Sequence, residues 1–182
     1  MKNLFVAACL VCSAAQAQPT VQASAALKPI AALDVPRYMG TWYEIAKFPN
    51  WFQKKCVADT RATYSLQPDG TVQVVNRCRK ENGEVDQAIG EARQIGVATS
   101  PRLQVRFAPA WMSWLPLVWG DYWVIDLDER YQLVAVSEPS RKYLWVLSRS
   151  PEVSAETYAD LLARLQRQGF TLEQLEKTRQ TP

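Results

Sequence analysis

The chain has 182 residues, of which 48% are hydrophobic and 21% charged, and its net charge is +3 at pH 7. These values are typical of a globular protein with one well-developed core. A net charge this small gives no support for nucleic-acid binding. The sequence contains no histidine, which excludes a Ser-His-Asp or Cys-His catalytic site and a histidine-ligated zinc ion.

The first residues have the pattern of an export signal. One cation, Lys2, is followed by an apolar run and then by the small-residue segment 15–17. This pattern predicts a signal peptide over residues 1–17 that is cleaved after Ala17. The alternatives are an N-terminal core helix and a lipid anchor at Cys9, because the residues before Cys9 resemble a lipobox.

The segment after the predicted signal is rich in Ala, Pro, Ser and Gln and carries one charge. We expect residues 18–33 to form a tether with little structure, or alternatively a short helix. The folded domain is then expected over residues 34–182.

The number of cysteines changes when the signal is removed. Cleavage leaves Cys56 and Cys78 as the two cysteines of an exported protein. Such a pair predicts one disulfide, with two free buried thiols as the alternative.

From Gly40 onward, stretches rich in β-forming residues alternate with short turns. The clearest turn, Pro68-Asp69-Gly70, is a strong hairpin signal. Eight strands are predicted, over residues 40–48, 58–67, 71–80, 87–99, 102–108, 121–127, 131–139 and 142–149. Eight consecutive strands favour a closed antiparallel up-and-down barrel, which has no exposed edge and is wide enough for one small ligand. A β-sandwich is the structural alternative.

One helix is expected after the last strand. Ser154 is a suitable N-cap, and Gly169 is a suitable C-terminal stop. Between them, apolar residues recur at helical spacing, at Tyr158, Leu161, Leu162 and Leu165. We expect this helix to pack outside the barrel, which makes the fold all-β with one C-terminal α-helix.

Three short motifs resemble the signatures of the lipocalin family. Gly40-Thr41-Trp42 is similar to the first signature, Gly-x-Trp, and Arg149 is similar to the third, a lone arginine that ends the last barrel strand. Asp128 and Tyr131 resemble the second signature, with leucine in place of the usual threonine before the aspartate. The resemblance covers about residues 34–178 and is closest to the bacterial outer-membrane lipocalins, near apolipoprotein D.

The resemblance gives these signature residues structural roles. It implies that Trp42 and Arg149 meet at the closed end of the barrel, where the guanidinium group stacks on the indole. We therefore expect Gly40, Trp42, Asp128 and Arg149 to hold the fold rather than to contact a ligand.

In a meander, alternate links lie at the same end of the barrel. The links that follow strands one, three, five and seven should therefore share the open end. Their apolar members are Trp51, Phe52, Trp111, Met112, Trp114, Leu115 and Trp119, and their cations include Lys54, Lys55, Arg141 and Lys142. We expect a mouth for an amphipathic ligand, with an anionic head group among the cations, or a contact with a membrane. The alternatives are aromatic residues that cap the core and ordinary surface charges.

The same reasoning places Cys56 and Cys78 near each other at the open end. Strict hairpin register would pair Thr60 with Cys78, so the disulfide requires a bulge or a bent loop.

Side-chain alternation suggests which residues face the interior. If Trp42 points inward, Glu44, Ala46 and Phe48 should do so too. A buried Glu44 needs a partner or a raised pKa. Further interior candidates are Tyr64, Val75, Phe107, Trp123 and Trp145.

The leading hypothesis is a protein that binds fatty acids or lysophospholipids without catalysis, cofactor or metal. The resemblance implies a periplasmic location, a possible association with the outer membrane and a role in its maintenance. The alternatives are a lipocalin-fold enzyme that acts on a lipid and a carrier of a pigment or haem-like ligand. We expect the protein to be a monomer or a homodimer.

Overall fold

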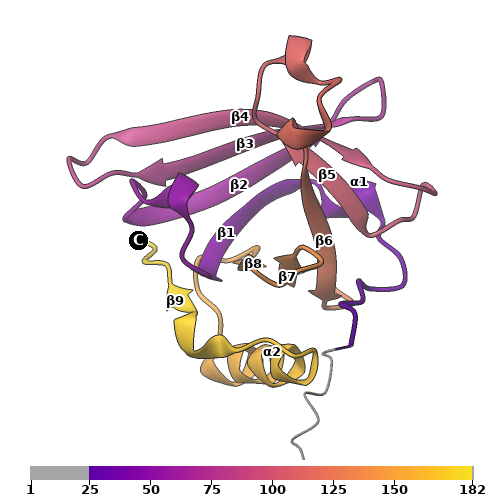
Figure 1. The fold of residues 1–182 in the computed structure, drawn as a ribbon. Helices are drawn as coiled ribbons and strands as arrows, with labels where there is room; N and C mark the ends of the chain where they lie inside the picture. The colour runs from indigo at the N-terminus through magenta and orange to yellow at the C-terminus, as the bar shows by residue number, and fades with distance from the viewer. Residues whose placement is uncertain (1–24, 182) are drawn as a thin grey trace, which may run out of the picture.

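The computed structural model describes residues 25–181 as one antiparallel β-barrel with a helix on its outside (Figure 1). The barrel strands are β1 (Gly40–Lys47), β2 (Ala58–Leu66), β3 (Val72–Arg79), β4 (Val85–Gln94), β5 (Arg102–Arg106), β6 (Gly120–Leu127), β7 (Leu133–Ser137) and β8 (Leu144–Ser148). Each strand pairs with the next in the chain, and β1 pairs with both β8 and β2. The predicted eight-stranded meander is therefore confirmed, and it closes as expected.

The predicted fourth strand is too long. β4 ends at Gln94, and residues 95–101 turn back towards β5, with Gly96 at a φ of +95°. A positive φ suits glycine and cannot continue a strand. The apolar residues that follow Gln94 therefore belong to a turn, although their composition resembles that of a strand.

Two β-bulges change which side chains face the interior. The register of β1 against β8 shifts between Glu44 and Ala46, and that of β6 against β7 shifts between Val124 and Asp126. A bulge inserts one residue and so reverses the alternation beyond it. The prediction that Ala46 and Phe48 face the interior is wrong for this reason, because both lie in the cluster outside the barrel.

The helix α2 (Ala155–Arg167) packs on the outer wall as predicted (Figure 1). The side chain of Ser154 accepts a hydrogen bond from the Thr157 backbone N–H at 3.2 Å, which caps the first turn. Leu161 and Leu165 are fully buried against Phe48 and the outer faces of β7 and β8. The protein therefore has two cores, one inside the barrel and one between the barrel and the helix.

The closed end of the barrel is built around Trp42. This side chain has no exposed surface, its Nε1 donates to the Tyr38 carbonyl at 2.9 Å, and the Arg149 guanidinium lies 3.9 Å from its ring centre. Arg149 also donates to the carbonyls of Arg37, Met39 and Thr41. The guanidinium group thus ties the short helix α1 (Val35–Tyr38) to the start of β1, in the arrangement that the resemblance implied.

The other two signature residues also have structural contacts. A Cβ at Gly40, whose φ is +96°, would lie 3.1 Å from the Arg149 guanidinium, so glycine suits this close approach. Asp128 accepts hydrogen bonds from the backbone N–H groups of Arg130, Gln132 and Leu133 in the turn between β6 and β7. Both residues stabilise the closed end.

Residues 25–33, which were expected to be part of a tether, pack on the barrel. Leu27 and Leu33 are buried, and the backbone N–H groups of Ile30 and Leu33 donate to carbonyls of the barrel domain at 2.9 and 2.8 Å. Burial of these apolar side chains offsets the entropy of ordering the segment. The predicted signal peptide and residues 18–24 lie outside the described residues.

The C-terminal tail completes the wall of the barrel. β1 pairs with β2 from Gly40 to Tyr43, and beyond that point the short strand β9 (Glu176–Lys177) pairs with the end of β1. The Gln180 amide then bridges the two strands, because its Nε2 donates to the carbonyls of Glu44 at 2.7 Å and Thr60 at 3.0 Å. The tail therefore fills the gap where β1 and β2 separate.

Candidate ligand-binding site

The barrel encloses a cavity of about 620 Å³. Its wall contains apolar side chains from facing strands, among them Val72, Val74, Leu103 and Leu147. Volumes of this size are typical of sites for small molecules and lipids. Trp42 and Arg149 close one end of the barrel, so a ligand must enter from the opposite end.

Several residues that the sequence singled out line this cavity. They are Glu44, Trp51, Phe52, Tyr64, Phe107 and Trp145. At the mouth, 72% of Trp51, 43% of Phe52 and 44% of Phe107 is exposed. The Phe107 ring lies directly over Gly90, where a Cβ would come within 2.7 Å of the ring, so the missing side chain makes room for it.

Two predicted interior aromatic residues face outward instead. Phe48 lies beyond the β1 bulge and packs against Phe170 near α2, with ring centres 6.3 Å apart. Trp123 lies on the outer face of β6 with the Arg102 guanidinium 4.7 Å from its ring centre, because its neighbour Tyr122 takes the inward position. Val75 is likewise outside, since Val74 lines the cavity.

The predicted cationic mouth is largely absent. Arg141 donates to the carbonyls of Gln168 at 3.0 Å and Ala25 at 2.6 Å, so it caps the end of α2 rather than the cavity. The Lys142 ammonium lies 5.7 Å from the Tyr143 ring centre and, like Lys54, does not line the cavity. Lys55 does reach the wall, where it pairs with Asp86 at 2.8 Å.

Two arginines that the sequence analysis did not single out belong to strands of the wall, but their side chains point outward, because Arg77 lies two residues after the outward-facing Val75. Arg61 and Arg77 lie opposite each other on β2 and β3. Arg77 donates to Gln87 at 2.7 Å.

The tryptophan-rich loop between β5 and β6 extends beyond one end of the barrel (Figure 1), and none of its tryptophans lines the cavity. Trp111 is 73% exposed, Trp114 is 74% exposed and Leu117 is 98% exposed. Trp119 packs on the outer wall, where the Arg93 guanidinium lies 4.0 Å from its ring centre. The loop forms two short 3-10 turns, Ala110–Met112 and Pro116–Val118, and of their residues Val118 lines the cavity.

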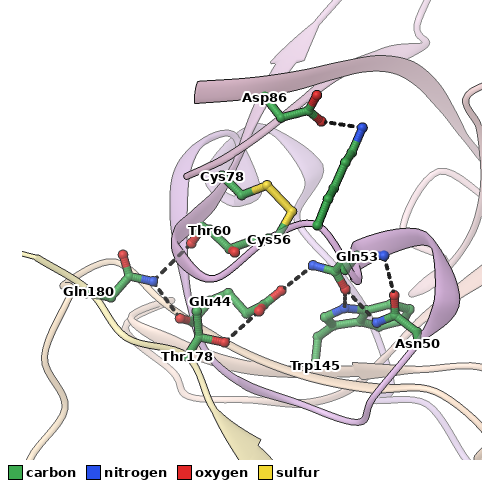
Figure 2. The surroundings of a disulfide bond; sticks show 11 residues. Glu44, Asn50, Gln53, Cys56, Thr60, Cys78, Asp86, Trp145, Thr178 and Gln180 are labelled. Carbon is green, nitrogen blue, oxygen red and sulfur yellow. Dashed lines mark hydrogen bonds and ion pairs between the residues drawn. A yellow bond between two sulfur atoms is a disulfide. The ribbon is translucent and has the colours of Figure 1, made fainter. Parts of the chain in front are cut away.

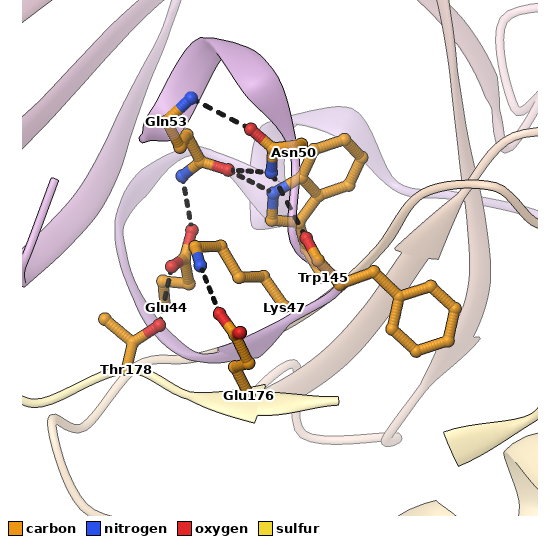
Figure 3. Close-up of polar contacts among 8 residues, drawn as sticks. Glu44, Lys47, Asn50, Gln53, Trp145, Glu176 and Thr178 are labelled. Atoms are coloured by element: carbon orange, nitrogen blue, oxygen red, sulfur yellow. Dashed lines mark hydrogen bonds and ion pairs between the residues drawn. The ribbon is translucent and has the colours of Figure 1, made fainter. Parts of the chain in front are cut away.

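Glu44 is a buried acid at the cavity wall and is only 2% exposed. Its carboxylate accepts hydrogen bonds from Gln53 Nε2 at 2.7 Å and Thr178 Oγ1 at 2.6 Å (Figure 3). Gln53 Oε1 in turn accepts from Trp145 Nε1 at 3.0 Å and Asn50 Nδ2 at 2.6 Å. This network joins β1, the loop after β1, β8 and the C-terminal tail.

Burial raises the pKa of Glu44, while the hydrogen bonds from Thr178 and Gln53 and the charge of Lys47 partly oppose that rise. Because the folded pKa lies above the usual 4.5, the native state binds the proton more tightly than the unfolded chain does. The contribution of Glu44 to stability is therefore fully present below pH 4.5 and is lost as the pH rises through the folded pKa.

Replacing Glu44 with glutamine removes this titration. We expect the wild-type free energy of unfolding, relative to that of Glu44→Gln, to fall as the pH rises from 4.5 through the folded pKa. Urea unfolding of both proteins at a series of pH values measures this difference. Glu81→Gln, at an exposed turn, is the control. A difference between wild type and Glu44→Gln that is constant with pH would contradict the assignment.

The predicted disulfide is present between Cys56 and Cys78, whose Cα atoms are 5.4 Å apart (Figure 2). The hairpin register shifts between Ala58 and Arg61, which provides the irregularity that the disulfide requires. The bond attaches the loop that carries Trp51 and Phe52 to β3. It therefore holds one side of the cavity mouth in place.

Sequence reasoning missed two tyrosines of the cavity wall. Tyr38 and Tyr122 line the cavity together with Tyr64. Tyr122 Oη lies 2.8 Å from Tyr38 Oη and 3.0 Å from Tyr64 Oη. Tyr38 precedes the first strand, so alternation could not place it, and Tyr122 stands next to Trp123, which was chosen instead.

Residues 25–181 contain neither a cluster of metal ligands nor a membrane-spanning helix. No group of cysteines and acidic residues in this part of the chain could hold a metal ion. None of its helices is long and apolar enough to cross a membrane.

A closed eight-stranded barrel with an apolar cavity and an Arg–Trp contact at its closed end defines a barrel protein that binds a small hydrophobic ligand. The model of the Lipocalin-like domain family matches residues 33–180, and the chain belongs to this family. Membership supports the binding or transport of a small hydrophobic ligand.

Similar proteins agree with this assignment. The chain is 41% identical over 157 residues to temperature-induced lipocalin-1 of Arabidopsis thaliana, covering 85% of this chain and 83% of that protein. It is 40% identical over 138 residues to outer membrane lipoprotein Blc of Escherichia coli K12, and the match covers 75% of this chain and 73% of that protein. Among solved structures, the cockroach allergen Per a 4 has the same fold, with a TM-score of 0.62 and 21% sequence identity. The match covers 82% of this chain and 89% of the allergen chain.

Proposed function

We propose that the protein binds one fatty acid or lysophospholipid in its barrel cavity and carries it in the service of outer-membrane maintenance. The observation that carries the proposal is the apolar cavity of about 620 Å³ with a closed end. Transfer of an acyl chain from water to such a cavity gains about 0.8 kcal/mol per methylene group. Burial of the acyl chain of the ligand therefore supplies the binding affinity, and binding requires no chemical reaction.

The chemistry of the chain supports a binding protein rather than an enzyme. It has no histidine to act as general base. The cysteines of the described residues are joined in a disulfide, so neither is a thiolate nucleophile.

The proposed location is the periplasm, with the outer membrane as a possible site of association. The signal-like residues 1–17 support export, and a relative is an outer membrane lipoprotein.

Titration of the purified protein with a fluorescent fatty acid tests the proposal. We expect saturable binding of one molecule per chain and displacement of the probe by a lysophospholipid. The absence of saturable binding, or displacement by neither unlabelled fatty acid nor lysophospholipid, would overturn it.

We also propose that the loop between β5 and β6 contacts a lipid bilayer. The supporting observation is the strong exposure of Trp111, Trp114 and Leu117 on one loop. Tryptophan and leucine side chains of this kind partition into the interface between lipid head groups and chains. A carrier with this contact would release and collect its cargo close to the membrane.

The variant Trp111→Ser/Trp114→Ser/Leu117→Ser is expected to bind lipid vesicles at least about tenfold more weakly, because three apolar side chains no longer leave water. Fatty-acid binding in solution should stay within about twofold, since none of the three lines the cavity. Co-sedimentation with vesicles measures the first effect. The control Leu66→Ser/Ile89→Ser/Val97→Ser removes exposed apolar side chains elsewhere and should bind vesicles like wild type. Equal losses in both variants would contradict a specific contact.

A further inference from the structure

Three tyrosine hydroxyl groups meet in the cavity wall. Tyr122 Oη is the centre of the group, 2.8 Å from Tyr38 Oη and 3.0 Å from Tyr64 Oη. Tyr38 is 2% exposed and Tyr64 is 7% exposed, and all three residues line the cavity. We call Tyr38, Tyr64 and Tyr122 the tyrosine cluster.

The cluster is held rigidly by its neighbours. The rings of Tyr38 and Tyr64 are stacked with centres 5.7 Å apart, and Tyr38 lies on Trp42 with centres 5.0 Å apart. Gly40, at the start of β1, pairs with Tyr64, which places the cluster close to the closed end. The hydroxyl groups are therefore fixed where the leading end of a ligand arrives.

A count of protons shows that the cluster cannot satisfy itself. Each hydroxyl group has one proton to donate, so the cluster has three donors, whereas its two O···O contacts use two of them. If Tyr38 and Tyr64 both donate to Tyr122, the Tyr122 proton is left over. If Tyr122 donates to one neighbour, the proton of that neighbour is left over instead.

The remaining proton has no acceptor within the described part of the chain. No further hydrogen bond of the three hydroxyl groups exists among residues 25–181. Buried polar groups nearly always find a partner, so the acceptor must come from solvent or from the ligand. A hydrocarbon chain that displaces solvent here leaves the donor unpaired, and a chain that carries an oxygen satisfies it.

Titration does not remove the donor at ordinary pH. Burial raises the pKa of Tyr64 to about 12, and burial raises those of Tyr38 and Tyr122 well above their usual value. The three hydroxyl groups therefore stay protonated.

We propose that the tyrosine cluster is a donor site for an acceptor oxygen on the buried part of the ligand, so that the preferred cargo is an acyl chain carrying a carbonyl oxygen near its leading end. This inference rests on the proposed function, because it specifies the kind of lipid that the cavity selects. It assigns selectivity to the closed end, whereas apolar burial supplies affinity along the whole cavity.

A series of oxo-octadecanoic acids, with the ketone at successive positions in the distal half of the chain, tests this directly. Competition against a fluorescent fatty acid should show one position that binds roughly three- to tenfold more tightly than octadecanoic acid. In the variant Tyr38→Phe/Tyr64→Phe/Tyr122→Phe, which keeps the rings and removes all three donors, this preference should disappear. Octadecanoic acid itself should bind the variant as tightly as wild type, or more tightly.

Tyr143→Phe is the matched control, because Tyr143 lines the cavity outside the cluster and should leave the preference unchanged. Circular dichroism verifies the fold of each variant. Loss of the preference in Tyr143→Phe, or its survival in the triple variant, would overturn the assignment.

Infrared spectroscopy of the wild-type protein gives a second test that needs no variant. The stretching band of a ¹³C-labelled ketone at the preferred position should move to lower frequency than in hydrocarbon solvent, because the carbonyl accepts a hydrogen bond. A band at the hydrocarbon frequency, or equal binding of every oxo acid and octadecanoic acid, would overturn the inference and leave the proposed function intact. Failure of both kinds of acid to bind would overturn the proposed function and the inference with it.

Discussion

Replacing Trp42 with alanine is expected to lower the free energy of unfolding by about 4 kcal/mol. The indole is fully buried at the closed end, donates a hydrogen bond to the Tyr38 carbonyl and lies under the Arg149 guanidinium. Its removal leaves a cavity and deprives Arg149 of the surface on which it packs. Urea unfolding, followed by circular dichroism, measures the loss.

Trp123→Ala is the matched control for Trp42→Ala. Trp123 is half-buried on the outer wall, and its removal should lower the free energy of unfolding by only about 1.5 kcal/mol. Equal losses in the two variants would show that the closed end contributes no more to stability than an ordinary packing contact does.

Replacing Val74 with tryptophan is expected to lower the affinity for long-chain lipids at least about tenfold. Val74 is 4% exposed and lines the cavity from the third position of β3, between Tyr64 and Gly90. A larger side chain there extends into the space that an acyl chain needs. Titration with the fluorescent fatty acid measures the loss.

The neighbouring residue provides a control of the same type. Val75 lies on the outer face of the same strand, so Val75→Trp should keep the wild-type affinity within about twofold. If both substitutions weaken binding equally, the site lies elsewhere or the variants share a general loss of structure. If neither weakens it, the cavity is not the lipid site.

Much of the fold could be predicted because its signals are local. Turn residues such as Asp69-Gly70 separate the strands, and the capped amphipathic pattern from Ser154 to Gly169 specifies the helix. The order of the links then places Trp51 and Phe52 at the cavity mouth. The bulge required by Cys56–Cys78 could also be inferred, since register counting shows the mismatch.

The direction of individual side chains, into the barrel or away from it, could be predicted less well. The bulge in β1 has no signature in the sequence, yet it moves Phe48 from the cavity to the outer core. Tyr122 and Trp123 are both suited to a strand, so composition cannot decide which of them points inward. The contacts of Glu44 with Thr178 and of Arg141 with Ala25 join segments far apart in the chain, and no local pattern reveals them.

The direction of the tryptophan-rich loop was also beyond sequence reasoning. The composition shows that apolar residues are concentrated in this loop. It does not show whether their side chains are buried over a ligand or exposed to solvent above the barrel. The structure places Trp111 and Trp114 outside and Trp119 against the outer wall, where it contacts Arg93. The stacking partners of Trp119 come from other strands and only the folded barrel brings them together.

Native mass spectrometry of the purified protein after incubation with a mixed lipid extract shows whether the barrel cavity binds a lipid. We expect a population that carries one fatty acid or one lysophospholipid per chain, and its absence from Val74→Trp under the same conditions. A wild-type protein that stays empty, or a Val74→Trp variant that carries the same lipid to the same extent, would contradict binding in the barrel cavity.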